Sequence, residues 1–321
     1  MLSNFIFSLN STLPIFLIIV LGWCLMKAGI LTKEFNAAAD KYVFKVALPV
    51  LLFEDIATAN IRQDFDLKFF LFCMIATTIM FLGVWLLAVL FMKDKSMIGA
   101  FVQGSARGSA AVLGIAFVNN IYGDSGMAPM MIVAAVPLYN IFSVIILSVH
   151  SNNKEDMDRA HLVRSTLKNV VTNPIILGIV AGLPFSLLGI DITGAAFTIP
   201  YKVVTNLANT ATPIALLVVG AGFEGRKAIK KIKPTLIATF IKLIALPAIF
   251  FPFAIALGFR NSELVAILVM LGSPTTVTCY IMAKNMGNDE VLSSSIIVMA
   301  TLLSSVTLTF WVFLMRSLGL I

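Results

Sequence analysis

The chain has 321 residues, of which 59% are hydrophobic and 12% are charged, whereas an average soluble protein is about 25% charged. Together with a mean hydropathy of +0.99, this composition excludes an ordinary soluble domain and predicts an integral membrane protein. The formal net charge of +7 at pH 7 would by itself also fit a nucleic-acid-binding protein, so the positions of the basic residues must decide between the two classes.

Apolar stretches long enough for a membrane-spanning helix recur along the whole chain. A helix needs about 20 residues to cross the roughly 30 Å hydrocarbon core of a bilayer. The sequence therefore predicts an all-α membrane protein with ten transmembrane helices. The expected spans are 11–28, 37–56, 68–92, 97–121, 128–149, 168–189, 199–223, 234–257, 262–285 and 290–316.

Basic residues gather in the connections that follow odd-numbered spans, with Lys27, Arg226, Lys227 and Lys231 as examples. Cytoplasmic loops of membrane proteins collect Lys and Arg. The asymmetry predicts a multi-pass protein of the plasma (cytoplasmic) membrane with both termini outside the cytoplasm. It also disfavours nucleic acid as a partner, because the most basic segment, Gly225 to Pro234, is short and adjoins a predicted span.

Two halves of the chain resemble each other across a polar linker, which we place at 150–167, between a first five-helix repeat (1–149) and a second one (168–321). The segment "PIFLIIVLG" from Pro14 resembles "PIILGIVAG" from Pro174, which starts 160 residues later. A spacing of 164 residues then relates three further pairs, Pro49 with Pro213, Gly108 with Gly272, and Gly123 with Gly287. Five spans is an odd number, so the second repeat must be inverted in the membrane, which is typical of secondary transporters with a site near the midplane.

Helix interruptions are expected in the fourth and ninth spans, at "GSARGSAAVLG" from Gly104 and at "LGSPTTVTC" from Leu271. Pro274 lacks a backbone donor, and small residues around it weaken the helix. Broken helices of this kind build transporter sites, although small residues also allow close helix packing. The predicted positions of a helix break or kink are Gly104, Gly114, Gly272, Pro49 and Pro213. Ordinary kinks are expected at Pro137, Pro184, Pro247 and Pro252.

Lys45, Lys242 and Arg107 are the cations that lie well inside predicted spans, away from the first and last residues. Lys45 and Lys242 are about two turns from the cytoplasmic ends of their helices, so their ammonium groups are expected to reach the membrane surface. Arg107 lies deeper, and two interpretations stay open for it. Its guanidinium could pair with a substrate carboxylate, or it could cap the carbonyl groups of the broken turn.

No carboxylate occupies the middle of a span, since Glu54 and Asp55, like the other acids, lie near span ends. A proton relay through a central acid is therefore disfavoured, unless an acid at the end of a span faces a water-filled cavity. Sodium coupling through hydroxyl groups and freed carbonyls remains open, and the sequence predicts no other cofactor.

Cysteines and histidines give no sign of an enzyme. Cys24, Cys73 and Cys279 fall in apolar spans without metal-ligand spacing, so inert buried thiols are expected. His150 and His161 both belong to the polar linker, and no metal or nucleophile constellation can be assembled from them. A membrane-embedded enzyme is thus only a distant alternative.

The chain resembles the auxin efflux carrier family, which includes bacterial malate and malonate permeases and the plant auxin exporters. The resemblance covers nearly the whole chain and rests on "LPIFLIIVLGWCLMKAGIL", "VALPVLLFEDIA", "RGSAAVLGIAFVNNIYGD" and "SPTTVTCYIMAKNMGNDEVLSSSIIVMATLLS". The chain has Ser109 where that family commonly has asparagine.

This resemblance implies two inverted five-helix repeats, broken crossing helices 4 and 9, and an elevator-type movement. It implies a scaffold of helices 1, 2, 6 and 7 that forms a homodimer, and a transport domain of helices 3–5 and 8–10. The implied substrate is a small organic anion, such as a dicarboxylate or an auxin-like carboxylate. A sodium-coupled symporter of the bile-acid type, which shares the inverted plan, is the alternative.

The candidate substrate site combines both predicted breaks. Its expected residues are Arg107, Gly108, Ser109, Ser273, Pro274 and Thr275, with Asn119 and Asn120 as further candidates.

Overall fold

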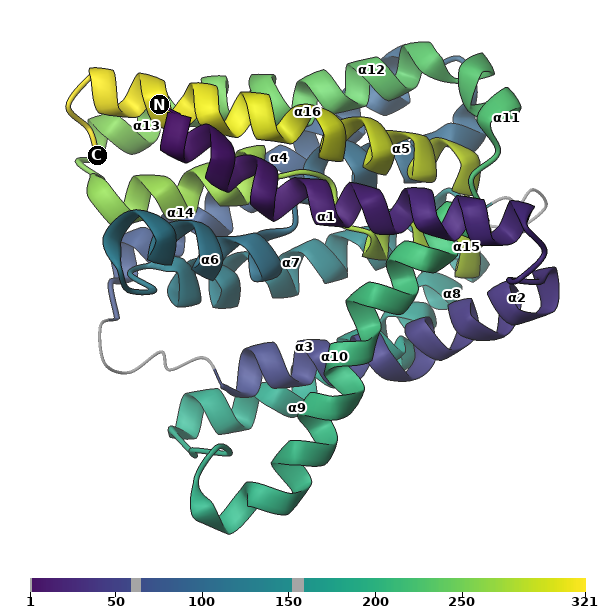
Figure 1. Cartoon of the computed structure of the whole chain (residues 1–321), viewed down its shortest axis with the longest axis horizontal. Helices are drawn as coiled ribbons and strands as arrows, with labels where there is room; N and C mark the ends of the chain where they lie inside the picture. Colours follow the sequence, from purple (N-terminus) through teal and green to yellow (C-terminus); the bar gives the residue numbers. More distant parts are fainter. Residues whose placement is uncertain (1, 59–64, 152–158) are drawn as a thin grey trace.

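The computed structural model describes residues 2–58, 65–151 and 159–321, which form helices joined by short connections (Figure 1). In this part of the chain the β-structure is limited to one isolated antiparallel bridge, between Gly108 and Thr275. The main helices are α1 (Leu2–Lys27), α2 (Lys33–Tyr42), α3 (Leu48–Ala57), α4 (Leu67–Phe91), α5 (Ile98–Ala106), α6 (Ala110–Tyr122), α7 (Ala128–Val149), α8 (Arg159–Thr172), α9 (Pro174–Leu188), α10 (Thr198–Ala221), α11 (Gly225–Lys230), α12 (Ile232–Phe240), α13 (Leu246–Ala256), α14 (Asn261–Gly272), α15 (Thr278–Asn285) and α16 (Glu290–Ser317).

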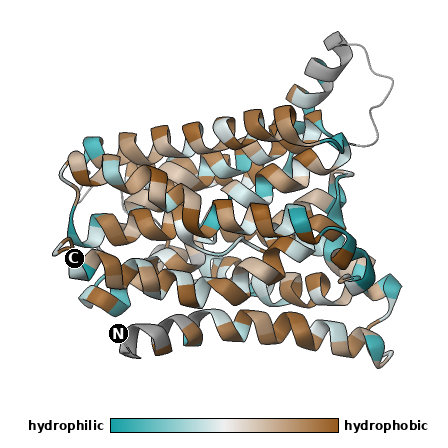
Figure 2. Ribbon diagram, turned by 90° about the horizontal axis from the view of Figure 1, so that it is seen from above, coloured by the Kyte–Doolittle hydropathy of each residue, from teal (hydrophilic) through white to brown (hydrophobic). Residues whose placement is uncertain are grey.

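Long apolar helices and an apolar outer surface make this a membrane protein. Among the described residues, five helices are long and apolar enough to cross a bilayer, namely α4, α7, α10, the continuous stretch 232–256 and α16. A sixth span is possible if α8 and α9, which meet at an angle of 52°, are counted together. Side chains such as Phe91 and Ile199, each 78% exposed, suit a lipid environment, and apolar residues cover most ribbons in Figure 2.

Two of the long helices contain a π-helical turn just before a proline. The first turn, Val43–Ala47, joins α2 to α3 ahead of Pro49, and the second, Ile241–Ala245, joins α12 to α13 ahead of Pro247. Proline cannot donate to the carbonyl four residues earlier and its ring collides with that group, so a wider turn relieves the conflict. Pro213, the expected counterpart of Pro49, lies within helix α10, where no π-helical turn precedes it, so the two prolines differ in their local helix.

The predicted linker and the three cysteines agree with the sequence predictions in part. The predicted linker 150–167 contains residues 152–158, which lie outside the described residues, but from Arg159 onward it is part of α8. Cys73 and Cys279 are buried as expected, whereas Cys24 is exposed on α1.

Glycines bring two pairs of helices into backbone contact. A Cβ atom on Gly22 of α1 would lie under 3.0 Å from the carbonyl oxygen of Leu217 on α10, closer than real Cβ atoms approach. On α9, a Cβ atom on Gly182 would lie 2.8 Å from the carbonyl oxygen of Phe53 on α3. Small residues allow such close packing between membrane helices, so these glycines fix the approach of α1 to α10 and of α9 to α3.

Candidate functional site

Two connections between consecutive helices meet in the interior of the protein. Helix α5 ends at Ala106 and α6 begins at Ala110, while α14 ends at Gly272 and α15 begins at Thr278. The extended residues between them run antiparallel, and the backbone N–H of Ser109 donates to the carbonyl oxygen of Pro274 at 3.0 Å. We call this place the crossing, defined by residues 107–109 and 273–277.

A side chain at Gly108 would displace the Ser273 and Lys242 side chains at the crossing. A Cβ atom at this position would lie 2.8 Å from the ammonium nitrogen of Lys242 and closer still to the hydroxyl oxygen of Ser273. Glycine at this position therefore leaves room for both side chains where the two chain segments meet.

The interruptions leave carbonyl groups at the ends of α5 and α14 that need hydrogen-bond donors. The hydroxyl group of Thr275 donates to the Gly104 carbonyl at 2.7 Å, and that of Tyr139 donates to the Met270 carbonyl at 2.8 Å. The Lys242 ammonium donates to Ala106, Met270 and Leu271, at 3.2, 3.1 and 2.8 Å. One lysine thus serves the ends of both helices.

The expectation that Lys242 extends to the membrane surface is wrong. Its side chain is 0% exposed and points from the π-helical turn into the crossing. The freed carbonyls supply oxygen ligands at the same depth, so the ammonium group gains more there than by extending along the lipid surface. Lys45, in the other π-helical turn, is exposed.

Arg107 belongs to the crossing but bonds none of the freed carbonyls through its side chain. One guanidinium nitrogen donates to the Asn140 side-chain oxygen and another to the Met282 sulfur, both at 2.8 Å. Asn140 is itself held by donating to the Val136 carbonyl at 2.9 Å. Capping of the broken turn is thus performed by Lys242, and Arg107 has only neutral partners among the described residues.

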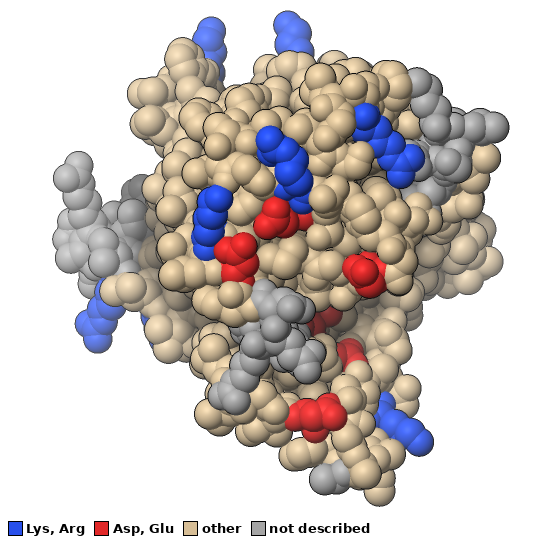
Figure 3. Space-filling model, turned by 90° about the vertical axis from the view of Figure 1, so that its left-hand side faces the viewer, with Lys and Arg blue, Asp and Glu red and all other residues tan. Residues whose placement is uncertain are grey.

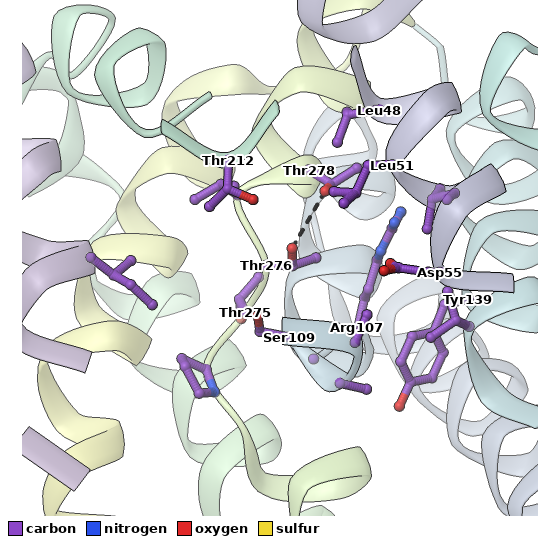
Figure 4. A pocket seen from close by; sticks show the side chains of 18 of the residues that line it. Leu48, Leu51, Asp55, Arg107, Ser109, Tyr139, Thr212, Thr275, Thr276 and Thr278 are labelled. Atoms are coloured by element: carbon purple, nitrogen blue, oxygen red, sulfur yellow. Dashed lines mark hydrogen bonds between the residues drawn. The ribbon is translucent and has the colours of Figure 1, made fainter. Parts of the chain in front are cut away.

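A cavity opens beside the crossing, and Arg107 lies on its wall (Figure 4). Of the predicted site residues, Arg107, Gly108, Ser109, Pro274 and Thr275 line this cavity. The first residues of α6 and α15 line it as well, namely Ala110, Ala111 and Thr278. The positive dipole ends of two helices therefore border the same space as a guanidinium group.

Three predicted residues lie elsewhere. Ser273 is fully buried behind the cavity wall, and its hydroxyl has no hydrogen-bond partner among the described atoms. Asn119 and Asn120 are exposed near the far end of α6 and do not line the cavity.

Gly104 and Gly114 are packing positions within helices rather than breaks. A Cβ atom on Gly104 would lie 2.8 Å from a methyl group of Ile296, and one on Gly114 would lie 2.9 Å from the methyl group of Met131. Gly272 is the last residue of α14, so it does adjoin an interruption.

Asp55 is a site residue that the sequence did not single out. It lies on α3 and lines the cavity together with Arg107, although no ion pair joins the two side chains (Figure 4). The available signal was an acid inside the apolar run "LLFEDIA", which an acid bordering a water-filled cavity would explain.

Comparisons with known proteins agree with these features. A family model described as "Membrane transport protein" matches residues 7–312. An "Uncharacterized transporter" of Methanothermobacter thermautotrophicus is 23% identical over 308 residues, which cover 96% of this chain and 98% of that protein. The "Uncharacterized transporter YfdV" of Escherichia coli K12 is 24% identical, covering 97% and 98%. A "Putative malonate transporter" of Rhizobium meliloti is 23% identical, covering 95% of each chain.

Proposed function

We propose that this chain, which belongs to the membrane transport protein family of auxin efflux carrier-like proteins, is a secondary transporter of small organic anions. The family makes the chain a membrane transporter, and this fits a protein that is not an enzyme. Dicarboxylates and auxin-like carboxylates are the substrates that we propose first. The name of the Rhizobium meliloti relative supports including malonate among them.

The observation that carries this proposal is the unpaired charge of Arg107 on the cavity wall. Its partners Asn140 and Met282 are neutral, and a thioether sulfur is a weak acceptor. A carboxylate entering the cavity would bring the missing negative charge and could accept two parallel bonds from the guanidinium. Helix N-termini on the same wall would stabilise the same anion.

We propose ten spans in two inverted repeats, and the glycine contacts support this arrangement. Gly22 and Gly182 lie 160 residues apart, and their partners Leu217 and Phe53 lie 164 apart. The contact of α1 with α10 is thus repeated, with the roles of the halves exchanged, by the contact of α9 with α3. Two equivalent contacts of this kind are expected if the halves are related by a pseudo-two-fold axis.

We further propose that α1, α3, α9 and α10 belong to a scaffold and that the remaining long helices form a transport domain. Figure 1 shows α3, α9 and α10 grouped on one side, away from α4 and α12. The cavity is lined by Leu52 of α3 and Thr212 of α10 on the scaffold side and by the crossing on the other. A site between the two groups suits an elevator movement. The apolar scaffold surface would be the contact for a homodimer.

The charge distribution supports an orientation with both termini outside the cytoplasm. Acidic side chains are interspersed with basic ones at the end of the molecule that carries the termini, which Figure 3 views directly. The opposite end carries the basic helix α11 with Arg226, Lys227 and Lys230.

A thermal-shift screen of small organic acids on the purified protein tests the proposed function. The screen compares malonate, malate, succinate and indole-3-acetate with uncharged amides of the same acids, with and without sodium and at two pH values. Saturable stabilisation by an acid but not by its amide is the expected result. Stabilisation by the amides alone, or by none of the acids, would contradict an anion site.

Asp55→Asn should tighten anion binding by roughly threefold to tenfold at neutral pH, because the change removes a negative charge from the cavity wall. Isothermal titration with the best acid from the screen measures the effect. Glu54→Gln is the matched control, since Glu54 accepts a hydrogen bond from Thr205 at 2.5 Å and does not line the cavity. Weaker binding by Asp55→Asn would mean that the carboxylate assists the substrate instead of opposing it.

A further inference from the structure

We infer that the ammonium group of Lys242 is a built-in cation at the crossing, in the place where a coupling sodium ion would otherwise bind, and that the transporter therefore works without sodium. The inference rests on the proposed function in one respect, since it assigns the coupling of that same site. It separates this protein from a sodium-coupled symporter of similar plan.

The first support is the set of oxygen atoms around the ammonium nitrogen. Three backbone carbonyls converge on it from two different helices, Ala106 from α5 and Met270 and Leu271 from α14. In broken-helix transporters, freed carbonyls and the C-terminal ends of half-helices are the groups that coordinate sodium. Lys242 therefore occupies a cage whose donor atoms are those of a cation site.

A fourth oxygen belongs to the same place. The position that a Cβ atom of Gly108 would occupy lies under 3.0 Å from both the Ser273 hydroxyl oxygen and the Lys242 nitrogen. That hydroxyl is completely buried and has no hydrogen-bond partner among the described residues. A buried hydroxyl without a partner is costly, and its oxygen would be available to a cation in the cage.

The partial negative charges of the helix ends explain why the single ammonium group of Lys242 is enough to neutralise the cage. The C-terminal ends of two α-helices each carry about half a negative charge, so the two ends together match a single ammonium group. No carboxylate of the described residues forms an ion pair with Lys242. A sodium ion beside the ammonium would place two positive charges in a region with compensation for one, and it would meet repulsion there.

The local backbone is built to deliver the lysine to this position. Lys242 lies in the π-helical turn Ile241–Ala245, where the extra residue per turn alters the direction of the side chains relative to a regular helix. The turn is fixed from α16, because the Trp311 indole donates to the Leu243 carbonyl at 2.9 Å. π-helical turns frequently accompany functional sites.

The test measures unfolding temperature in detergent without any organic acid, in NaCl and in choline chloride at equal ionic strength. The parent protein should show no sodium-specific stabilisation. Lys242→Ala should unfold at a lower temperature and should gain a saturable, sodium-specific rise of about 3 °C or more, because its vacated cage binds the ion. Lys45→Ala, which removes the exposed lysine of the other π-helical turn, is the matched control and should show neither effect.

Two results would overturn the inference: saturable sodium-specific stabilisation of the parent protein, or a folded Lys242→Ala protein that does not respond to sodium. If Lys242→Ala cannot be purified in folded form, the deciding measurement is the unfolding temperature of the parent protein as sodium is titrated to several hundred millimolar. The absence of organic acids keeps this test separate from the proposed function, because a failure to find a substrate leaves its outcome unchanged.

Discussion

Arg107→Ala should weaken the binding of organic anions by at least tenfold to a hundredfold, since a charge-assisted hydrogen-bonded pair contributes about 1.5–3 kcal/mol. The guanidinium is 4% exposed and lies on the cavity wall without a carboxylate partner in the described part of the chain. Its removal takes away the positive charge that a substrate carboxylate would meet. Isothermal titration with an acid that stabilises the parent protein measures the loss.

The fold should survive this substitution. The Ala106 and Gly104 carbonyls accept hydrogen bonds from Lys242 and Thr275, and among the described residues the Arg107 side chain donates only to Asn140 and Met282. Unfolding temperature in the absence of ligand should therefore fall only slightly. Arg226→Ala, at an exposed arginine of α11, is the control and should leave affinity unchanged. Anion affinity equal to that of the parent protein in folded Arg107→Ala would remove Arg107 from the substrate site.

Gly220→Ala should be among the most destabilising single-methyl changes in the protein. A Cβ atom on Gly220 of α10 would lie under 3.0 Å from the carbonyl oxygen of Ile19 on α1, where the obstacle is backbone and cannot rotate away. Overpacking of this kind costs about 1–3 kcal/mol, and more where the helices cannot separate. Thermal unfolding of the purified protein should show a lower midpoint, and expression should fall with it.

Gly83→Ala is the matched control for that experiment. Gly83 also lies within a long helix, α4, but a Cβ atom there would have no atom within 4 Å. Alanine is a better helix former than glycine, so this variant should be as stable as the parent protein or slightly more so. Equal unfolding temperatures of the two variants would show that α1 and α10 do not pack as closely as their glycines indicate.

Composition and local chemistry predict a large part of this structure. Continuous apolar runs with few charges lead to membrane helices, because only internally hydrogen-bonded segments are stable in lipid. The interruptions at Gly108 and Pro274 follow from the local weakness of the helix around them. Helix α5 ends at Ala106 and α14 ends at Gly272, next to these residues, because Gly and Pro act on their own backbone, whatever surrounds them.

Features that depend on distant partners could not be predicted in the same way. Counting residues along its helix places Lys242 close to the membrane surface, but the carbonyls that hold it belong to other helices, α5 and α14. Gly104 lies three residues before Arg107 and was expected to loosen the helix, yet its role is set by Ile296 of α16. Asp55 lines the cavity because α3 packs beside the crossing, a contact that the local sequence does not encode.

The shared cage at the crossing also sets an order for biogenesis. The Ala106 carbonyl accepts from Lys242, which lies 136 residues later in the chain, and the Gly104 carbonyl accepts from Thr275, which lies 171 residues later. While residues 1–149 are being synthesised these donors do not yet exist, so water or the insertion machinery must satisfy the two carbonyl groups. We therefore expect that residues 1–149 do not fold independently, and a ribosome-bound chain that stops before residue 242 should remain sensitive to protease near Arg107.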